Sequence, residues 1–217
     1  MDGNRRWARK MGKRSIRGHA AGQEVLHQIV EHAFKVGVKY LTVYAFSTEN
    51  WRRNDTEVKY LMQQIDRALR KHLQEFIDAE VRIVILGSAD GLSDKVKRSL
   101  MAAEQATENG TKGTLGVCLN YGGYKELVDA TRKLIDSGVE TQNIDDEAIE
   151  RQLYHPELPP IDLVIRTGGE KRLSNFMLWR AAYSELIFRD EYWPDFTPRI
   201  FNECLVEYSK RQRRFGK

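Results

Sequence analysis

Cysteine is scarce in this sequence of 217 residues, which contains only two, Cys118 and Cys204. They form no CxxC pair and have no histidine nearby at ligand spacing, which disfavours a redox or metal role for either thiol. Cys118 lies in an apolar run and Cys204 in an expected helix. Both are therefore predicted to be buried thiols of a protein that works in a reducing compartment.

Long apolar runs and a strong charge of one sign are also missing. No signal peptide and no run of about 18 apolar residues occurs, so we expect a cytoplasmic protein with at most peripheral contact at the inner face of the membrane. Lys and Arg total 35 against 31 Asp and Glu, a net charge of +4 that is spread along the chain. A balance this mild argues against a nucleic-acid partner, although a local arginine cluster could bind an anionic small ligand.

Helix-like and strand-like patterns alternate through the whole length of the chain. Apolar residues at three- and four-residue spacing predict helices over about 20–36, 55–79, 93 onward, 124–135, 145–153 and 198 onward. Short apolar, β-branched or aromatic runs predict strands over 40–46, 81–86, 114–119 and 161–165. The alternation predicts one α/β domain over residues 1–217, with a mostly parallel central sheet covered by helices on both faces.

Ligands of such sheets bind at the carboxyl ends of the strands, which draws attention to the loops after Met1 and after each strand. Four of these loops are rich in glycine, arginine or carboxylates, and they follow Met1, Phe46, Leu119 and Ile165. Each motif is weak by itself, because Asp-Gly-Asn is a common turn and arginines on loops are usually solvated. Their coincidence at one edge of a sheet is what indicates a site.

A protein binds a diphosphate through backbone N–H groups, arginine forks and a divalent cation. The first loop supplies these groups around Asp2 and Arg6, with Asp2 free to hold magnesium. The loop from Arg166 to Ser174 adds two arginines, a pair of glycines and a hydroxyl for a second phosphate group. We therefore predict an enzyme that acts on diphosphate esters and whose active site begins at the first residues of the chain.

A hydrophobic tunnel beside the sheet would complete such a site. The strands over 41–46 and 83–86 and the helix over 58–76 are more apolar than a minimal core requires, although an ordinary core explains them as well. If these elements line a tunnel, an isoprenoid tail fits it, and each buried CH₂ group contributes about 0.8 kcal/mol. Long tails would then leave slowly, and a membrane would be the natural sink.

Several motifs follow one another along nearly the whole chain. They are MDGNRRWA at 1–8, GHAAG at 18–22, YAFSTENWRR at 44–53, NYGG at 120–123, DLVIRTGGEKRLSNFMLW at 162–179, AYSEL at 182–186 and WPDF at 193–196. In sequence and in order they resemble the cis-prenyltransferases, and among these the bacterial undecaprenyl diphosphate synthases, also called isoprenyl transferases.

The resemblance implies a Mg²⁺-dependent reaction in which isopentenyl diphosphate attacks the allylic carbon of an allylic diphosphate, with farnesyl diphosphate as the expected primer. The product would be a Z-polyprenyl diphosphate, a lipid carrier for cell-wall glycan synthesis, released through transient peripheral contact with the membrane. Residues 213–216 resemble the Arg-x-Gly tail of the family, which reaches the active site across a dimer interface. A homodimer is expected for this reason.

The resemblance also assigns roles to residues. Asp2 and Asn50 are assigned to catalysis, and Glu185 is expected to complete the metal site with Asp2. The allylic diphosphate is expected to contact Gly3, Asn4, Arg5, Arg6 and His19. The residues expected to shape the substrate site are Trp7, Ser47, Thr48, Glu49, Trp51 and Arg53. Isopentenyl diphosphate is expected to be held by Arg166, Arg172, Leu173 and Ser174. Because an amide is a poor base, we interpret Asn50 as orienting a proton path to diphosphate or solvent.

Four positions depart from the family pattern. Ser15 stands where the family often has an arginine, so either Arg14 or Arg17 is expected to meet the phosphate instead. Lys171 replaces a histidine of some members, which weakens the case for a third metal ligand there. The other two departures are Tyr124 and Ser88, in place of a usual Arg and Asp.

Two alternatives compete with this interpretation. A trans-type prenyl synthase needs DDxxD motifs, and the pair Asp145-Asp146 does not have that form. A non-catalytic or short-chain homologue that supports a partner subunit would lack parts of the first loop, yet Asp2, Asn4 and Arg6 are all present. Since the family carries an apolar strand before this loop, we expect the given sequence to start inside a longer natural protein, with the N-terminal strand missing.

Overall fold

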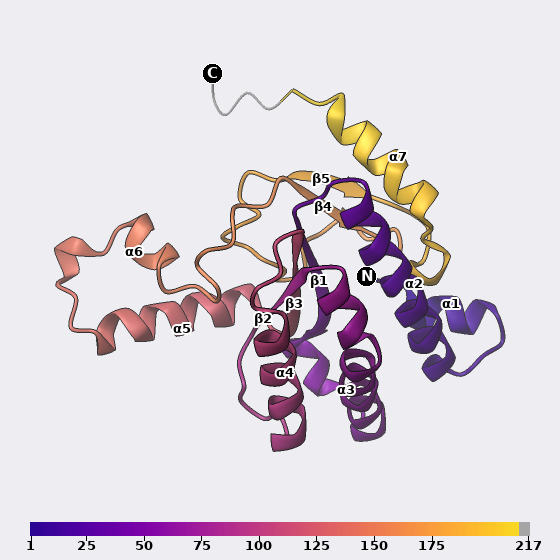
Figure 1. Cartoon of the computed structure of the whole chain (residues 1–217), viewed down its shortest axis with the longest axis horizontal. Helices are drawn as coiled ribbons and strands as arrows, with labels where there is room; N and C mark the ends of the chain where they lie inside the picture. Colours follow the sequence, from indigo (N-terminus) through magenta and orange to yellow (C-terminus); the bar gives the residue numbers. More distant parts are fainter. Residues whose placement is uncertain (213–217) are drawn as a thin grey trace.

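The computed structural model describes residues 1–212, whose five strands form two parallel sheets (Figure 1). The larger sheet has the order β1-β3-β2, with β1 at Tyr40–Ser47, β3 at Gly113–Tyr121 and β2 at Val81–Leu86. The smaller sheet pairs β4, Leu163–Arg166, with β5, Glu185–Phe188. In each sheet the loops that follow the strands therefore leave from one edge.

Strand β3 lies at the centre of the larger sheet because its sequence is apolar on both faces. Nearly every side chain of this strand is buried, as expected for a parallel strand that is covered on both sides. Cys118 on β3 and Cys204 near the end of the chain have no exposed surface, and burial raises the pKa of both thiols, that of Cys204 to about 11. The prediction of two buried cysteines is confirmed.

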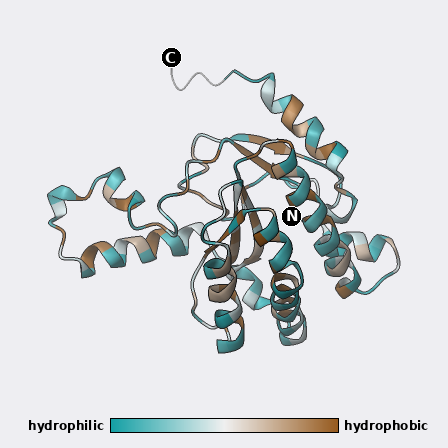
Figure 2. Ribbon diagram, viewed as in Figure 1, coloured by the Kyte–Doolittle hydropathy of each residue, from teal (hydrophilic) through white to brown (hydrophobic). Residues whose placement is uncertain are grey.

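Three amphipathic helices cover one face of the larger sheet. They are α2 at Ser15–Lys35, α3 at Asp55–Asp78 and α4 at Asp94–Thr107. Val30 of α2 and Ala103 of α4 pack with Ile83 and Val117 of the sheet in one core, and Figure 2 shows the hydrophobic residues gathered on the strands. None of the helices within residues 1–212 is long and apolar enough to cross a membrane.

The opposite face of the larger sheet is covered by irregular chain. Val84, Leu86 and Cys118 pack there against Leu158 and Met177, which lie on either side of β4 in the sequence. Irregular chain of this kind cannot be predicted from hydrophobic periodicity, because loops and turns bury single residues at irregular spacing. Helices were predicted on both faces of the sheet, but they cover only one face, and irregular chain covers the other.

The smaller sheet belongs to the same folded unit. The last helix, α7 at Pro198–Ser209, packs Ile200 and Cys204 against Ile29 of α2 and Ile187 of β5. Because α2 also packs on the larger sheet, both sheets share one continuous set of buried side chains. The predicted single α/β domain with parallel strands is confirmed.

Two helices form an arm that stands away from this body, α5 at Gly123–Asp136 and α6 at Asp146–Glu150 (Figure 1). The arm has a small core of its own, since Ala130 and Leu134 of α5 and Ala148 of α6 are buried. The outer side of α5 exposes Val128 and Ile135, of which Ile135 is 68% exposed. The arm therefore presents apolar side chains away from the body.

Most predicted elements are found within two or three residues of their expected ends. Helix α2 is an exception, because it begins at Ser15 and not near residue 20, and the other differences concern short elements. Helix α1, Asn4–Lys10, and strand β5 were not among the predicted helices and strands. Helix α6 is shorter than the predicted helix at 145–153, and β4 begins at Leu163 and not at Ile161. Elements of four to seven residues are too short to show a clear hydrophobic period.

A cavity of about 960 Å³ lies between the two sheets. Leu41 and Val43 of β1 line one side and Leu163 and Ile165 line the other. Met1 packs against the cores on both sides, and burial lowers the pKa of its α-amino group to about 6, although the Asp2 carboxylate opposes that shift. Of the elements expected to line a tunnel, only β1 lines this cavity.

Candidate functional site

Asp2 is fixed at the carboxyl end of β4. Its backbone N–H donates to Thr167 Oγ1 at 2.9 Å, and the Thr167 hydroxyl donates back to the Asp2 carbonyl oxygen at 2.9 Å. The same carbonyl accepts a bond of 2.9 Å from the backbone N–H of Trp193. Three hydrogen bonds therefore hold the first residues against the strand end, as the sheet-edge rule predicts.

The Asp2 carboxylate is surrounded by cationic and N–H donors. Oδ2 lies 3.0 Å from Arg166 Nη2 and 3.4 Å from Arg6 Nη2, and Oδ1 accepts from the Gly3 N–H at 2.6 Å. Burial opposes ionisation of this carboxyl group, but the bond from Arg166, the Gly3 N–H and the charge of Arg6 outweigh it and hold its pKa below the usual value. Asp2 is therefore an anion near neutral pH.

The glycines of the first two motifs allow a close approach of α1 to its neighbours. Gly3 has φ of +100°, and a Cβ there would lie 2.6 Å from Tyr192 Cδ1. A Cβ on Gly18 would lie 2.0 Å from the Asn4 carbonyl oxygen, and one on Gly22 would lie 2.2 Å from Asn4 Oδ1. Asn4 Oδ1 is the one buried side-chain oxygen or nitrogen that lacks a hydrogen-bond partner within residues 1–212. Gly18 and Gly22 of the GHAAG motif thus act by allowing close packing.

The loop after β1 forms a short 3₁₀ helix, η1 at Thr48–Arg52. Asn50 Oδ1 accepts the Ser47 N–H at 3.1 Å and so caps this helix. Trp51 Nε1 donates to Asn120 Oδ1 at 2.6 Å, which ties η1 to the end of β3. Glu49 Oε1 accepts from Asn175 Nδ2 at 2.8 Å, and Thr48 lies against Gly122. Three loops therefore meet at one sheet edge.

A second cluster of charges surrounds Glu57 on the first turns of α3. Glu57 Oε1 lies 3.3 Å from His19 Nε2, 3.1 Å from Arg53 Nη1 and 3.9 Å from Arg5 Nε. Burial lowers the pKa of His19 despite the opposing hydrogen bond and charge of Glu57. Glu57 was not predicted as a site residue, because Arg53 lies before α3 and His19 and Arg5 reach Glu57 only in the folded chain.

The loop after β4 carries the remaining arginines. Arg166 Nη1 donates to Ser174 Oγ at 2.7 Å and to the carbonyl oxygen of Arg172. Glu170, which the sequence analysis did not single out, lies 2.6 Å from Arg172 Nη1 and 3.2 Å from Arg6 Nη1. Glu170 and Asp2 thus hold three guanidinium groups together at this edge.

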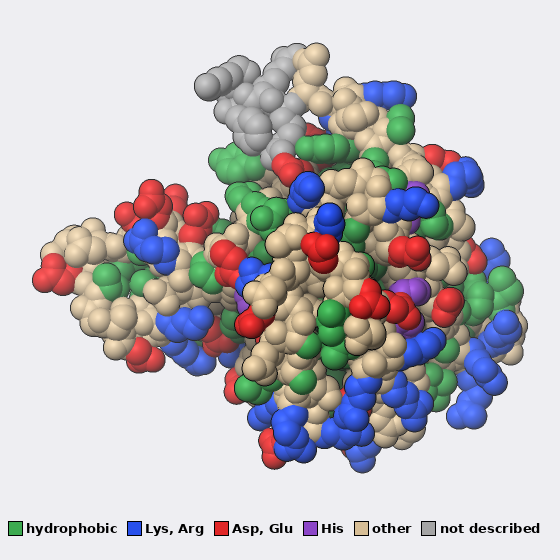
Figure 3. Space-filling view, in the orientation of Figure 1, with side chains coloured by type: hydrophobic (Ala, Val, Ile, Leu, Met, Phe, Trp, Pro, Cys, Tyr) green, Lys and Arg blue, Asp and Glu red, His purple; other side chains and the backbone are tan. Residues whose placement is uncertain are grey.

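Nine of the predicted residues line the mouth of the cavity between the sheets: Asp2, Ser47, Glu49, Asn50, Arg53, Arg166, Arg172, Leu173 and Ser174. The side chains are mostly polar at this end and apolar further in, from β1 and β4. Around the mouth, carboxylates and guanidiniums are paired, and on the face seen in Figure 3 both signs of charge are interspersed. The arrangement provides an anion-binding rim above an apolar interior.

Two predicted residues lie elsewhere. Trp7 Nε1 donates to Asp195 Oδ1 at 2.7 Å, which directs the indole to the 3₁₀ turn after β5. Glu185 pairs with Leu163 at the start of β4, about 10 Å along the strands from Arg166, and its Oε2 lies 2.7 Å from Arg211 Nη1. Within one chain, the structure therefore does not bring Glu185 to Asp2 as a shared metal site.

The residues at the rim suit a magnesium ion that is held mainly by substrate. Mg²⁺ prefers oxygen ligands in octahedral geometry and is commonly bound through one or two carboxylates plus phosphate oxygens. Asp2 offers such a carboxylate, ionised and 40% exposed at the mouth. A second carboxylate, Glu170, shares Arg6 with Asp2.

The resemblance to known proteins extends over the whole chain. A family model described as "Putative undecaprenyl diphosphate synthase" matches residues 1–216. An "Isoprenyl transferase" of Thermotoga maritima is 44% identical and the match covers 100% of this chain and 94% of the relative. A "Ditrans,polycis-undecaprenyl-diphosphate synthase ((2E,6E)-farnesyl-diphosphate specific)" of Haemophilus ducreyi is 41% identical over 100% of this chain and 91% of the relative.

Solved structures agree in fold. Lavandulyl diphosphate synthase from Lavandula x intermedia, crystallised with dimethylallyl diphosphate, superposes with a TM-score of 0.94 at 30% identity and covers 100% of this chain and 95% of its own. A "probable undecaprenyl diphosphate synthase" from Campylobacter jejuni gives 0.83 at 30% identity, covering 91% and 93%. Both neighbours therefore share the α/β fold described above.

Proposed function

The chain belongs to the undecaprenyl diphosphate synthase family of cis-prenyltransferases, and we propose that it condenses isopentenyl diphosphate with an allylic diphosphate in a Mg²⁺-dependent reaction. Farnesyl diphosphate is the proposed primer, as named for the relative from Haemophilus ducreyi. The product is a Z-polyprenyl diphosphate that serves as lipid carrier for cell-wall glycan synthesis. The observation that carries this proposal is the arginine-rich rim that surrounds the ionised Asp2 carboxylate.

The ion pairs of the rim suggest how the site binds diphosphate. Arg6, Arg166 and Arg172 are now paired with Asp2 and Glu170, so each guanidinium keeps an anionic partner before a substrate arrives. A diphosphate carries more negative charge than one carboxylate and can accept several N–H groups at once. It would take over these arginines and free the Asp2 carboxylate for the metal.

The reaction breaks the C–O bond between the allylic carbon and its diphosphate and forms a C–C bond to isopentenyl diphosphate. A proton is then lost and a Z double bond forms. The arginines stabilise the charge that develops on the leaving diphosphate, which is the largest electrostatic demand of the step. Bound magnesium, held by Asp2, would add to that neutralisation.

Asn50 assists this reaction by holding other groups in position and not by accepting the proton itself. Its Oδ1 already accepts the Ser47 N–H, and an amide oxygen is a poor base. We assign it the task of holding η1 and orienting the path of the proton, which is accepted by diphosphate or solvent. The same capping bond keeps Glu49 and Trp51 on their side of the mouth.

The growing tail is proposed to run beneath α3. The apolar stripe of this helix is only partly buried, although it faces the sheet; its members are Leu61, Met62, Ile65, Leu69, Leu73 and Phe76. The cavity between β1 and β4 suits a hydrocarbon less well, because a tail there would leave the facing strand edges without hydrogen-bond partners. Leu69→Trp should therefore shorten the product, and Leu163→Phe, in the cavity between the sheets, should not.

A homodimer is also part of the proposal. The tail at 213–216, on which the sequence argument rests, lies outside the described residues. Support comes instead from the outer side of α5, where Tyr124, Val128 and Ile135 expose apolar surface on the arm. The enzyme is proposed to work in the cytoplasm and to release its product at the inner face of the membrane.

The test follows radiolabelled isopentenyl diphosphate into butanol-extractable product. Purified protein with farnesyl diphosphate should form product only when Mg²⁺ is present, and Asp2→Ala should abolish it. Arg82→Gln, which removes a surface ion pair with Glu157 far from the rim, is the matched control and should remain active. Full activity of the Asp2→Ala protein would rule out the mechanism, and the chromatographic length of the product reports the chain length.

A further inference from the structure

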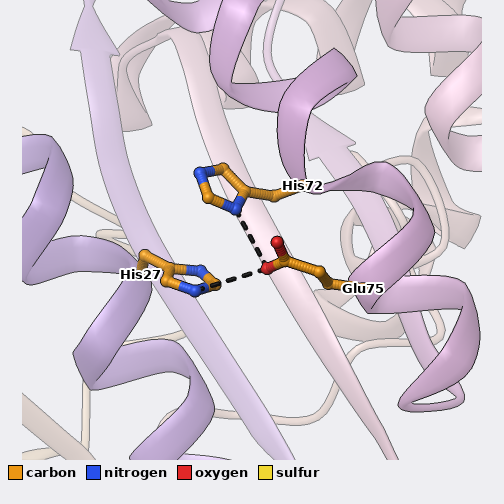
Figure 4. A group of neighbouring side chains, drawn as sticks. All are labelled: His27, His72 and Glu75. Carbon is orange, nitrogen blue, oxygen red and sulfur yellow. Dashed lines mark hydrogen bonds and ion pairs between the residues drawn. The ribbon is translucent and has the colours of Figure 1, made fainter.

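Two histidines and a glutamate converge at a place that the proposed reaction does not use. His27 lies on α2, whereas His72 and Glu75 lie three residues apart on α3 (Figure 4). Glu75 Oε2 is 3.3 Å from His27 Nε2 and 3.0 Å from His72 Nδ1, and the three potential ligand atoms lie within 4.8 Å of one another. The two imidazole rings are stacked, with centroids 4.2 Å apart and planes 28° apart.

One carboxylate oxygen, Glu75 Oε2, faces a nitrogen of each ring. Two positively charged imidazolium rings stacked in this way would repel each other, so the arrangement favours neutral rings, which can each offer a nitrogen lone pair. His72 is 12% exposed, so one of the two rings has been withdrawn from water to reach this position. Ring nitrogens and a carboxylate oxygen directed at one point form the donor set of a transition-metal site.

We propose that His27, His72 and Glu75 bind Zn²⁺, or a divalent ion of similar preference, and that the ion links α3 to α2. Tetrahedral zinc takes nitrogen ligands at about 2.0–2.1 Å and oxygen at about 2.0–2.2 Å, so its ligand atoms lie about 3.4 Å apart. The two contacts to Glu75 already have nearly this spacing, and the rings must turn out of their stacked arrangement for both nitrogens to face one ion. Three protein ligands leave the fourth position to water.

The site has an open approach from solvent. A cleft of about 600 Å³ lies beside it between α2 and α3; His72 forms part of its wall together with Gln23 and Gln64. At the other end of these helices, His19 and Glu57 make the second polar contact between them. The ion would therefore link the two helices beside the cleft, as the contact of His19 with Glu57 links them elsewhere.

Mg²⁺ is not expected to compete with Zn²⁺ for the site formed by His27, His72 and Glu75. This metal preference distinguishes the site from the catalytic rim around Asp2. Imidazole nitrogen suits Zn²⁺, Ni²⁺ and Cu²⁺, whereas Mg²⁺ selects oxygen ligands and keeps several waters. Binding can therefore be measured with Mg²⁺ in excess, and its outcome does not depend on whether the protein forms a polyprenyl product. The Asp2→Ala protein should bind Zn²⁺ as the unchanged protein does.

The experiment titrates chelator-treated protein with Zn²⁺ by calorimetry and with Co²⁺ by visible absorption. We expect one Zn²⁺ per chain and the strong absorption of four-coordinate Co²⁺. His27→Gln and His72→Gln should each weaken binding by at least about tenfold. His32→Gln is the matched control on α2; its ring bonds Asn202 at 2.8 Å instead, and its loss should leave binding unchanged.

Hydrogen exchange locates the bound ion independently of affinity. Zn²⁺ should slow exchange in the last turns of α3 and in the middle of α2 and leave the loop around Asp2 unaffected. Unchanged affinity in the double variant His27→Gln with His72→Gln would overturn the proposal. So would the absence of Zn²⁺ binding by the unchanged protein, or protection confined to the rim around Asp2.

Discussion

Two arginine–carboxylate pairs of this protein have the same chemistry and opposite surroundings. Arg180 and Glu126 lie 2.9 Å apart with side chains only 4% and 2% exposed. Arg180 also donates to the carbonyl oxygens of Tyr154 and His155, and Glu126 accepts from the Tyr121 hydroxyl at 2.5 Å. Both carboxylate oxygens and both terminal nitrogens of the guanidinium therefore have partners supplied by the fold. The pair joins β3, α5 and the segments before and after β4.

The pair of Arg166 and Asp2 is held less completely. The Asp2 carboxylate is 40% exposed, and its partners are guanidiniums at the mouth of a cavity. A buried pair is costly to break because the remaining charge stays unpaired in a medium of low dielectric, whereas a half-exposed pair can exchange partners with a ligand. The comparison indicates that the pair of Arg180 and Glu126 stabilises the fold, whereas the pair of Arg166 and Asp2 keeps charged groups available to bind a ligand.

The largest effect is expected on activity when the exposed pair loses its arginine. Arg166→Gln removes a charge-assisted donor to the diphosphate and should lower kcat/KM by about 10²–10³-fold. The free energy of unfolding should change by less than about 1 kcal/mol, because the partner that remains can be hydrated. Steady-state kinetics and urea unfolding measure the two quantities. A large loss of stability with normal kinetics would reverse the roles assigned to the two pairs.

The second effect is expected on stability when the buried pair is broken. Arg180→Met leaves Glu126 uncompensated inside the protein and should cost about 3–5 kcal/mol of unfolding free energy. The folded fraction should retain kcat/KM close to that of the unchanged protein. The double variant Arg180→Met with Glu126→Leu removes both charges and should regain much of the loss. If the double variant is no better than the single one, packing and not charge explains the effect.

The third effect is a pH dependence of opposite sign in the two regions. Burial lowers the pKa of His19 at the rim, so its contribution to stability falls as the pH drops below the unfolded value of 6.5 towards the folded pKa. The hydrogen bond to Glu104 raises the pKa of His155 in the enclosed region, so its contribution is complete below 6.5 and is lost as the pH rises through the folded pKa.

Urea unfolding between about pH 5 and pH 8 separates these contributions. His19→Gln should reduce the loss of stability in acid. His155→Gln should be less stable than the unchanged protein mainly at the acid end of the range. Parallel pH profiles for the two variants would show that the two environments do not differ as described.

The smallest effect is expected at the helix caps. Asn54 caps α3 by accepting the Glu57 N–H at 2.9 Å, and Asp145 caps α6 by accepting the Ala148 N–H at 2.8 Å. Replacing either by Ala should cost about 1 kcal/mol. Only Asn54→Ala should also raise KM, because Glu57 holds the cluster of His19 and two arginines at the rim. Equal KM values for both variants would remove Glu57 from the site.

Helices and strands with a clear hydrophobic period or a cap were predictable from the sequence. The order of these elements then predicted the sheet edge at which the ligand-binding loops lie. Strand β2 has the predicted bounds, Val81–Leu86, and α3 begins at the predicted Asp55 behind its Asn54 cap. Asp2 and Arg166 meet although they are 164 residues apart, because hydrogen bonds to Thr167 hold Asp2 at the carboxyl end of β4. The alternation of helix and strand predicted the sheet edge at which Arg166 lies.

Pairing register was the part that the sequence could not supply. Glu185 is placed opposite Leu163 by the hydrogen bonds between β4 and β5, and neither four-residue strand shows a period from which that register could be read. Glu170 and Glu57 were missed for a related reason, since their importance depends on which arginines reach them in space. The sequence shows which charged and polar residues each loop carries. It does not show which residues of other segments they contact in the folded chain.

The gap between the two sheets makes this protein receptive to other strands. Within residues 1–212, β1 and β4 each have one edge that no strand pairs with, and an unpaired strand edge is a template for any extended peptide. A single apolar, β-branched segment placed in the gap would bond both edges, and the three strands of one sheet and the two of the other would become a six-stranded sheet. Such a segment would add hydrogen bonds between backbones to the shared core that already joins the two sheets, and it would cover both open edges.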